Sequence, residues 1–353
     1  MRVNRRGAAE KMLGHELDAK WRLVRVLGTG GTATVYEAVH RNGRHAAVKL
    51  LDACAARDLA EAERQAMTES QIANAIDHPG IVQVHDDGVT SAGVPYLVME
   101  LLDGATLESM RFLAGGRLRL QECLPVLEAL LETVAAVHDA GIVHRDIKPE
   151  NVFVTRDGEV KLLDFGLAIG PTWMRESPWF GTPGYLAPEQ ARGEWAKVDA
   201  QSDLWAVAAT AFTALEGRLV HRGRTSRELV AAAAAYAVDL DDAELPEDVL
   251  SVLRRGLAFH RWKRWPDAHA MLVALRTAAE HGMHYRSGIM RAIRPLPSGD
   301  SATRFFHVTA SEETRQTHRR PSEPTLVRTL AGVTERDTCP VFSLRPPASR
   351  SAG

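Results

Sequence analysis

The chain has 353 residues, of which 45% are hydrophobic and 25% charged; such values are ordinary for a globular protein that can bury a sizeable core. At roughly 100–200 residues per domain, this length predicts about two domains or one large two-lobed unit. The formal net charge of −2 gives no electrostatic reason to expect a nucleic-acid or membrane partner, and we expect neither.

The three cysteines lie far apart and form no CxxC pair. This argues against a disulfide framework or a zinc site and is typical of a reducing compartment. The basic N-terminal residues lack the apolar core of a signal peptide. The longest apolar run, Leu229–Val238, is too short for a membrane-spanning helix, which needs about 20 residues. We therefore expect a soluble, cytoplasmic chain.

Residues 18–100 are expected to form a small, mainly antiparallel sheet with one helix, after a short and weakly ordered lead-in at residues 1–17. The helix covers about Asp58–Ile76. The strand-like runs are Arg22–Leu27, Thr34–Val39, Ala46–Leu50, Ile81–Val84 and Tyr96–Glu100.

Helices dominate residues 104–285. Leucines and valines recur at helical spacing through Gln121–His138, so one face of that helix is expected to be buried. The other elements are strands at Val152–Thr155 and Val160–Leu163 and helices at about Ser202–Leu215, Arg227–Ala237, Glu247–Phe259 and Pro266–Glu280. The predicted fold class is α+β and bilobal: an N-terminal lobe (N-lobe, 18–100) with a five-stranded antiparallel sheet and one helix, and a mainly α-helical C-terminal lobe (C-lobe, 104–285).

Residues 286–353 differ in composition from the rest of the chain. They contain seven prolines, eight serines, eight threonines, 11 arginines, six acidic residues and no lysine. Such a segment cannot bury enough apolar surface to offset its ordering entropy, so we expect a disordered tail. Its charge and short apolar clusters make it a candidate for binding a protein partner.

A glycine-rich turn, Leu27-Gly28-Thr29-Gly30-Gly31, lies between the first two strand-like runs. Glycines let backbone N–H groups approach phosphate oxygens closely. No Gly-Lys-Ser/Thr and no immediate helix follow, which disfavours a Walker A loop or a dinucleotide-binding fold. On its own the pattern fits a simple hairpin turn or a flap over phosphates equally well.

Lys49 lies in the apolar strand Ala46-Ala47-Val48-Lys49. A buried ammonium needs a carboxylate or a bound anion, unless the side chain reaches solvent at an edge. Glu69, on the following helix, is the candidate partner.

The most informative stretch is His144-Arg145-Asp146-Ile147-Lys148-Pro149-Glu150-Asn151, followed by Asp164-Phe165-Gly166 and Ala187-Pro188-Glu189. With the glycine-rich turn and the strand lysine, these motifs stand in the order found in protein kinases. The chain resembles the eukaryotic-like (Hanks-type) Ser/Thr protein kinases of bacteria from about Asp18 to Ala279. The resemblance implies the bilobal kinase fold and transfer of the γ-phosphoryl group of ATP to protein hydroxyls, including the chain's own, in intracellular signalling.

The resemblance also implies roles for individual residues. Asp146 would orient the substrate hydroxyl and accept its proton, and Lys148 would neutralise the γ-phosphate. Asn151 and Asp164 supply the hard oxygen ligands that suit Mg²⁺, with Mn²⁺ as a substitute. Lys49, directed by Glu69, would hold the α- and β-phosphates.

The nucleotide-binding residues follow by the same resemblance. The glycine-rich turn would cover the phosphates, and four apolar side chains would enclose adenine. Met99 would be the gatekeeper, and the backbone of Glu100 and Leu102 would bind the adenine edge. The turn contributes Gly28 and Gly30, and the apolar set is Leu27, Val35, Ala47 and Phe153. These apolar residues fit a plain hydrophobic core as well.

Residues 164–189 would form the activation segment. Thr172 and Ser177 are the candidate regulatory phosphorylation sites, whereas Thr182 resembles the threonine that contacts the catalytic base and lysine. Two scaffold contacts are also expected. Glu189 should pair with Arg264, and Asp203 should bind the backbone of the catalytic loop, which we define as residues 144–151.

Two positions depart from the family pattern. Ala33 replaces the third loop glycine, which would weaken the grip on nucleotide. Ala73 is small where a larger apolar residue usually packs towards Phe165, which would disfavour the active arrangement.

Two other functions therefore stay open beside an active kinase: a pseudokinase that binds without turnover, and a small-molecule phosphotransferase of the same fold. The intact set Lys49, Asp146, Asn151 and Asp164 argues against the first alternative. The long activation segment argues against the second.

Overall fold

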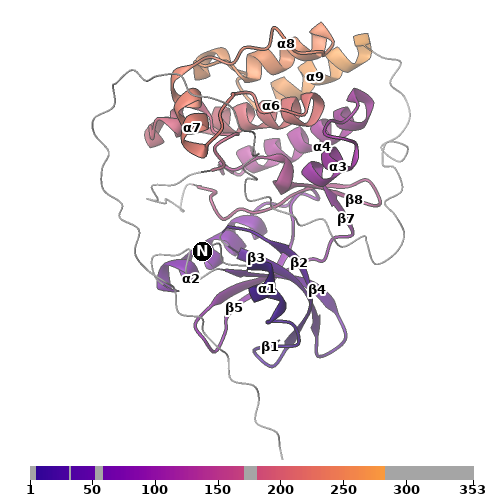
Figure 1. The fold of residues 1–353 in the computed structure, drawn as a ribbon, viewed down its shortest axis with the longest axis vertical. Coiled ribbons are helices and arrows are strands. Elements are labelled where there is room, and N and C mark those ends of the chain that lie inside the picture. Colours follow the sequence, from indigo (N-terminus) through magenta and orange to yellow (C-terminus); the bar gives the residue numbers. More distant parts are fainter. Residues whose placement is uncertain (1–4, 32, 52–58, 171–180, 283–353) are drawn as a thin grey trace, which may run out of the picture. The chain divides into compact units, whose positions relative to one another are not determined.

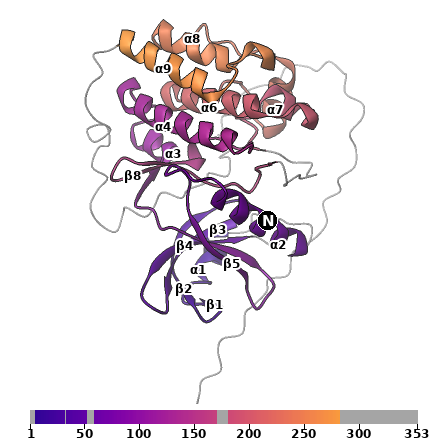
Figure 2. The same cartoon turned by 180° about the vertical axis from the view of Figure 1, so that it is seen from behind.

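The computed structural model describes residues 5–31, 33–51, 59–170 and 181–282. Thr172, Ser177 and the tail expected at 286–353 lie outside the described residues. The described chain forms the two predicted lobes, a sheet-rich N-lobe and a helical C-lobe (Figures 1 and 2). Within these ranges, no helix combines the length and the apolar character needed to cross a membrane.

The N-lobe contains one six-stranded antiparallel sheet in the order β1-β2-β3-β4-β6-β5. Its strands are β1 (Glu16–Leu17), β2 (Trp21–Thr29), β3 (Ala33–His40), β4 (His45–Leu51), β5 (Val84–Val89) and β6 (Pro95–Met99). The five-strand expectation missed β1, because two residues carry no periodic signal. The weakly ordered lead-in is also wrong from residue 5 onwards, where α1 (Arg5–Glu10) and β1 pack on the sheet.

The two faces of this sheet have different roles. One face buries Tyr36, Val48 and Tyr96 in a cluster with Ala9 of α1. Successive side chains of a strand point to opposite faces, so Lys49 lies on the other face, where Glu69 of α2 (Leu59–Asn74) contacts it. The alternation along β4 thus separates a purely structural face from the face that carries the candidate site.

One predicted strand was misplaced. We expected a strand at Ile81–Val84, but β5 begins at Val84 and runs through exposed residues that include Asp86 and Asp87. An edge strand needs little apolar sequence, so its residues gave no strand signal. Ile81 instead forms an isolated bridge with Leu162.

The C-lobe is built around α6 (Ala200–Glu216), nearly all of whose residues are buried. Asp199 caps its N-terminus and Gly217, with φ of 74°, ends it. The other elements are α3 (Leu107–Leu113), α4 (Leu120–Asp139), α5 (Pro188–Ala191), α7 (Ser226–Ala235), α8 (Glu247–Gly256), α9 (Ala268–Gly282), the 3₁₀ turns Pro149–Asn151, Trp195–Lys197 and Arg261–Lys263, and the small sheet β7 (Gly104–Thr106), β8 (Val152–Thr155) and β9 (Val160–Leu162). Sequence patterns missed α3, α5 and β7, which are too short for a periodic signal.

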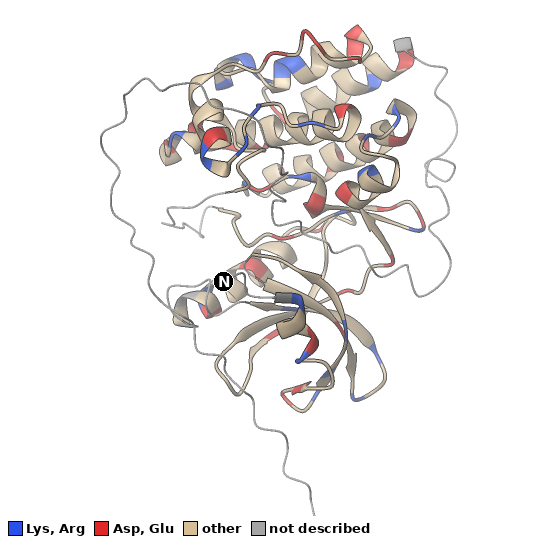
Figure 3. Cartoon of the chain, in the orientation of Figure 1, with Lys and Arg blue, Asp and Glu red and all other residues tan. Residues whose placement is uncertain are grey.

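Charged residues are mixed over both lobes. In Figure 3, acidic and basic residues are scattered along the ribbon of both lobes.

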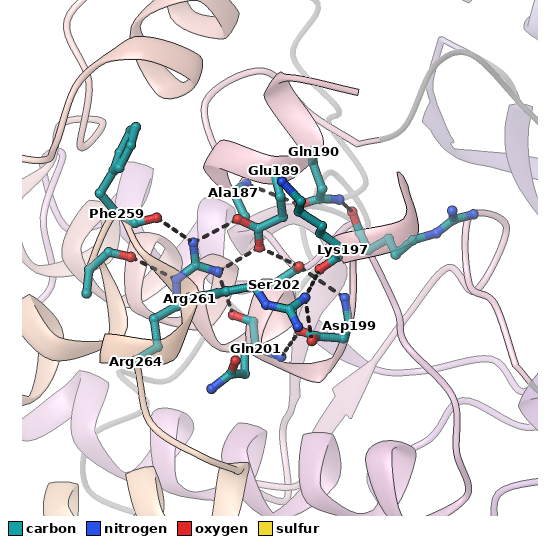
Figure 4. A network of polar contacts seen from close by, with 12 residues as sticks. Ala187, Glu189, Gln190, Lys197, Asp199, Gln201, Ser202, Phe259, Arg261 and Arg264 are labelled. Atoms are coloured by element: carbon teal, nitrogen blue, oxygen red, sulfur yellow. Dashed lines mark hydrogen bonds and ion pairs between the residues drawn. The ribbon is translucent and has the colours of Figure 1, made fainter. Parts of the chain in front are cut away.

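A buried ion pair ties the segment after residue 181 to the C-lobe (Figure 4). Arg264 donates from Nη1 to Glu189 Oε1 at 2.7 Å and from Nη2 to Oε2 at 2.9 Å, and Ser202 donates to the same carboxylate at 2.6 Å. This two-pronged geometry is the strong form of the Arg–carboxylate contact. Burial disfavours the charged carboxylate, but Arg264 and Ser202 outweigh it and lower the pKa of Glu189.

The turn between β1 and β2 predicts a stabilising substitution. Asp18 and Ala19 both have positive φ, 48° and 51°, and Lys20 N–H donates to Leu17 O across the turn. Alanine is strained there and glycine is not. We expect Ala19→Gly to raise the free energy of unfolding by about 0.5–1 kcal/mol, measured by chemical denaturation. Ala231→Gly, at an exposed position within α7, should lower it by about 0.5–1 kcal/mol. Equal effects would contradict the interpretation.

The Glu189–Arg264 pair predicts a large stability loss. Arg264→Leu leaves a buried carboxylate without its cation and should cost about 3–5 kcal/mol of unfolding free energy. Arg254→Leu breaks an exposed pair with Glu247 and should cost about 0–1 kcal/mol. Similar losses in both variants would contradict this assignment.

The lowered pKa of Glu189 predicts a pH dependence. Such a carboxylate stabilises the fold above its unfolded-state pKa of about 4.3, and this contribution is lost as pH falls towards the folded-state pKa. The difference in unfolding free energy between wild type and Glu189→Gln should therefore be constant from about pH 8 to pH 5 and shrink below that range. A difference in unfolding free energy that grows as pH falls would contradict the lowered pKa of Glu189.

Candidate functional site

Lys49 links three elements. Its Nζ lies 2.6 Å from Glu69 Oε1 on α2 and 2.9 Å from Asp164 Oδ1 after β9. Burial would lower the pKa of this lysine, but the two carboxylates outweigh it and raise the pKa above its ordinary value. Lys49 is therefore a fixed cation between the lobes.

Asp203 holds the catalytic loop from below. It lies fully buried on α6 and accepts hydrogen bonds from the backbone N–H groups of His144 and Arg145, both at 2.8 Å, and from His138 Nε2 at 3.0 Å. Burial opposes its charge, but these partners lower its pKa. Arg145 has a φ of 69°, a strained value that the two backbone hydrogen bonds help to hold.

Asp146 lies at the centre of a polar network. Lys148 Nζ donates to its Oδ2 at 2.7 Å, and Thr182 Oγ1 donates to its Oδ1 at 2.9 Å. Lys148 also contacts Thr182 directly, at 2.7 Å. Burial opposes the charge of Lys148, but Asp146 outweighs it and raises the lysine pKa. Thr182 lies 36 residues after Asp146 in the sequence, yet it meets Lys148 at the Asp146 carboxylate. Thr182 thus has the contacts expected of it.

Asn151 and Asp164 offer oxygens that suit a hard cation. The amide nitrogen of Asn151 donates to Asp146 O at 2.9 Å, so its side-chain oxygen is the end left for another ligand. Asp164 receives Lys49 and the Gly166 N–H on Oδ1, and its side chain is 40% exposed. Burial opposes its charge, yet Lys49 lowers its pKa. Two fixed oxygen donors, one of them a carboxylate, fit Mg²⁺ with phosphates and water completing its shell.

The glycine-rich turn connects β2 and β3. Gly28 pairs with Val35 across the hairpin, and Gly30 N–H donates to Ala33 O at 2.8 Å. Ala33 is not among the described residues with positive φ, and its side chain is buried. The alanine that replaces the third glycine therefore fits without backbone strain; its effect on nucleotide affinity stays a prediction.

The second departure, Ala73, is buried in the same core as Phe165. A small residue there was expected to disfavour the active arrangement, and the Lys49–Glu69 contact is formed beside it. Its effect on activity also stays a prediction.

Several expected adenine-binding residues lie apart from the ordinary core. Leu27, Ala47 and Phe153 are buried, yet they belong to neither of the two hydrophobic clusters of the described chain. Val152 and Val154 belong to the larger of these clusters, so strand alternation points Phe153 towards the opposite side. Ala47 pairs with Met99, which is partly buried and, unlike Ala47, packs against the larger cluster.

The connection between the lobes, residues 100–103, which we call the hinge, carries Glu100 and Leu102. Glu100 N–H donates to Gln83 O at 3.0 Å. In the described part of the chain no backbone hydrogen bond engages the Glu100 carbonyl or the Leu102 N–H. These are the two backbone groups expected at the adenine edge.

Two polar residues of this region were missed from the sequence. Lys161 lies buried in β9, and its Nζ is 3.1 Å from Glu100 Oε1. Gln190 donates to Arg145 O at 3.1 Å and accepts from Ala187 N–H. Lys161 carried the signal that singled out Lys49, a lysine within an apolar strand, whereas Gln190 carried none.

Comparison with known proteins agrees with this geometry. Residues 21–269, more than half of the chain, match the family model of the protein kinase domain. The chain is 41% identical over 211 residues to a probable serine/threonine-protein kinase of Streptomyces coelicolor (57% of this chain, 31% of the relative). It is 36% identical over 279 residues to the serine/threonine-protein kinase pkn2 of Myxococcus xanthus (74% and 33%) and 31% identical over 274 residues to PrkC of Bacillus subtilis (76% and 42%).

The chain spans less than half the length of these three relatives. The order of motifs, the bilobal fold and the match over residues 21–269 lead to one assignment. The chain belongs to the protein kinase family, and the sequence-based prediction of a Hanks-type Ser/Thr kinase fold is confirmed.

Proposed function

We propose that this chain is an active Ser/Thr protein kinase that transfers the γ-phosphoryl group of Mg·ATP to protein hydroxyls, its own included, in cytoplasmic signalling. The observation that supports it most is a pair of contact sets: Lys49 binds Glu69 and Asp164, and Asp146 binds Asn151 and Lys148. Phosphoryl transfer depends mainly on positioning and charge stabilisation, which such an array of fixed charges supplies.

In this proposal Asp146 orients the attacking hydroxyl and accepts its proton. Thr182 fixes one of its oxygens and Lys148 the other. Lys148 then lies close to the transferring group, where its ammonium offsets developing negative charge. A carboxylate with both oxygens held is a pre-organised base, which costs little reorganisation during reaction.

Lys49 would bind the α- and β-phosphates, with Glu69 keeping its ammonium in place. Asn151 and Asp164 would hold Mg²⁺, or Mn²⁺ in its place, and the bound cation would neutralise phosphate charge. Gly28 and Gly30 would bring backbone N–H groups over the phosphates. Leu27, Val35, Ala47, Phe153 and Met99 would enclose adenine, and the Glu100 carbonyl and Leu102 N–H would bind its edge.

We also propose the domain limits 18–285 for the catalytic unit and a role for 286–353 in binding a protein partner. The arginine-rich, lysine-free composition of the tail supports an electrostatic contact with an acidic surface. The net charge of −2 favours neither nucleic acid nor membrane as a partner of the whole chain.

The test is transfer of ³²P from ATP with Mg²⁺ to a generic acceptor such as myelin basic protein and to the chain itself. Phosphoserine or phosphothreonine should form with wild type, and Asp146→Asn should reduce the rate by about 10²–10⁴-fold because the general base is lost. Asp157→Asn changes an exposed acid in the turn between β8 and β9 and should leave the rate unchanged.

Two outcomes would contradict the proposal. Nucleotide binding with no transfer by wild type would indicate a pseudokinase. Labelling of small metabolites alone would indicate a small-molecule phosphotransferase.

A further inference from the structure

Lys161 is a buried cation that none of the proposed catalytic steps uses. It lies in the middle of β9, and its side chain is 8% exposed. Its Nζ contacts Glu100 Oε1 at 3.1 Å, and the Glu100 side chain is 23% exposed. Burying a lysine head group is costly unless it is paired, so its position depends on Glu100.

Glu100 is bound on a second side by the N-lobe. Its Oε1 accepts from the backbone N–H of Gln83 at 2.9 Å, and its own N–H donates to Gln83 O at 3.0 Å. One carboxylate oxygen thus joins the segment before β5, the hinge and β9.

β9 is itself tied to the same N-lobe segment. Leu162 N–H donates to Gly80 O at 2.7 Å, and Leu162 O accepts from Val82 N–H at 3.4 Å. Gly80 also packs so closely on α4 that an added Cβ would lie 2.0 Å from Thr133 Oγ1. Residues 80–82 are therefore attached to the C-lobe, and the Lys161–Glu100 pair extends this attachment to the hinge.

The register of β9 places Lys161 among the groups that would bind nucleotide. Lys161 is the cross-strand partner of Phe153 in the β8–β9 pair, so the two side chains leave the same face of the small sheet. Leu163, two residues on, donates from its N–H to Asn151 O at 2.8 Å. Asp164 follows directly. A shift of the hinge relative to β9 would therefore misalign the adenine edge and the two oxygens assigned to the metal.

We propose that Lys161 is a positioning residue: through its ion pair with Glu100 it fixes the hinge against β9, so that the adenine-binding backbone and the Asn151–Asp164 pair keep one spacing. The expected effect on KM for ATP rests on the proposed function, whereas the fixing of the hinge against β9 does not. Lys161 touches no reacting atom and acts only through Glu100.

The kinetic experiment compares Lys161→Met, Lys161→Arg and Arg156→Met. Arg156 is the matched control, because its Nε pairs with Asp103 at the other end of the hinge, but the partners are 34% and 71% exposed, and exposed pairs contribute little. Lys161→Met should raise KM for ATP roughly 10-fold with kcat and the KM for acceptor protein nearly unchanged, since nucleotide positioning is the part disturbed. Lys161→Arg should restore the wild-type value, and Arg156→Met should match wild type.

A double-mutant cycle adds the partner. Glu100→Gln together with Lys161→Met should be no worse than Lys161→Met alone, because both changes remove the same interaction.

A second measurement needs no catalysis. Hydrogen–deuterium exchange of the nucleotide-free protein should show the Gln83 and Glu100 amides exchanging roughly 10-fold faster in Lys161→Met than in wild type or Arg156→Met. If wild type transfers no phosphate, the proposed function fails while this exchange result still decides the mechanical inference.

The inference would be overturned by any of three results. The first is unchanged exchange at Gln83 and Glu100 in Lys161→Met. The second is an equal change in Arg156→Met. The third is a Lys161→Met enzyme that melts earlier but keeps the wild-type KM for ATP, because that would mark a merely structural lysine.

Discussion

The site depends on the ion pairs that the buried ammonium of Lys49 forms with Glu69 and Asp164. A charge on the inner face of a sheet is tolerated only when carboxylates surround it, and these come from α2 and from the residue after β9. Satisfying one lysine therefore fixes the position of a helix in the N-lobe and of a loop in the C-lobe. In the proposed function, the cation that fixes these two elements is also the one suited to bind an anionic substrate.

Strain is concentrated where the chemistry is proposed. Apart from the turn at Asp18 and Ala19, the positive-φ non-glycine residues of the described chain are Arg145 and Asp164. Each directly adjoins or forms part of the polar network. Such conformations cost of order 1–3 kcal/mol each and persist only when their surroundings hold them. Asp203 supplies that hold for Arg145 through two backbone contacts, and Lys49 with the Gly166 N–H supplies it for Asp164.

Sequence alone predicted the parts of the fold that have a periodic or motif signal. The long helix at Leu120–Asp139 and the strand carrying Lys49 were predicted to within a few residues, because apolar periodicity persists over enough positions. Glu69 was proposed as the partner of Lys49, and Thr182 as a contact of Asp146 by resemblance to the kinase family, whereas the contact between Lys49 and Asp164 was not predicted. In contrast, α1 and β1 are stabilised by tertiary contacts, such as that of Tyr36 Oη with Ala9 O, which no local pattern encodes. A lysine in an apolar strand indicates that it has a partner but not which residue that partner is. The pairing of Lys161 with Glu100 could therefore be identified only from the structure.

The two strand lysines show how one physical rule serves two purposes. Lys49 and Lys161 are both buried cations in short apolar strands, and each contacts a carboxylate on another element. Lys49 contacts Asp164, whose side chain is 40% exposed and accessible to a further ligand. In the proposed function, the charge of Lys49 is therefore available to phosphate. Lys161 contacts Glu100 Oε1, and the same oxygen accepts a hydrogen bond from the Gln83 N–H. The charge of Lys161 is therefore neutralised within the protein. On these two proposals, the surroundings of the partner carboxylate, and not the lysine itself, distinguish a phosphate-binding lysine from a positioning lysine.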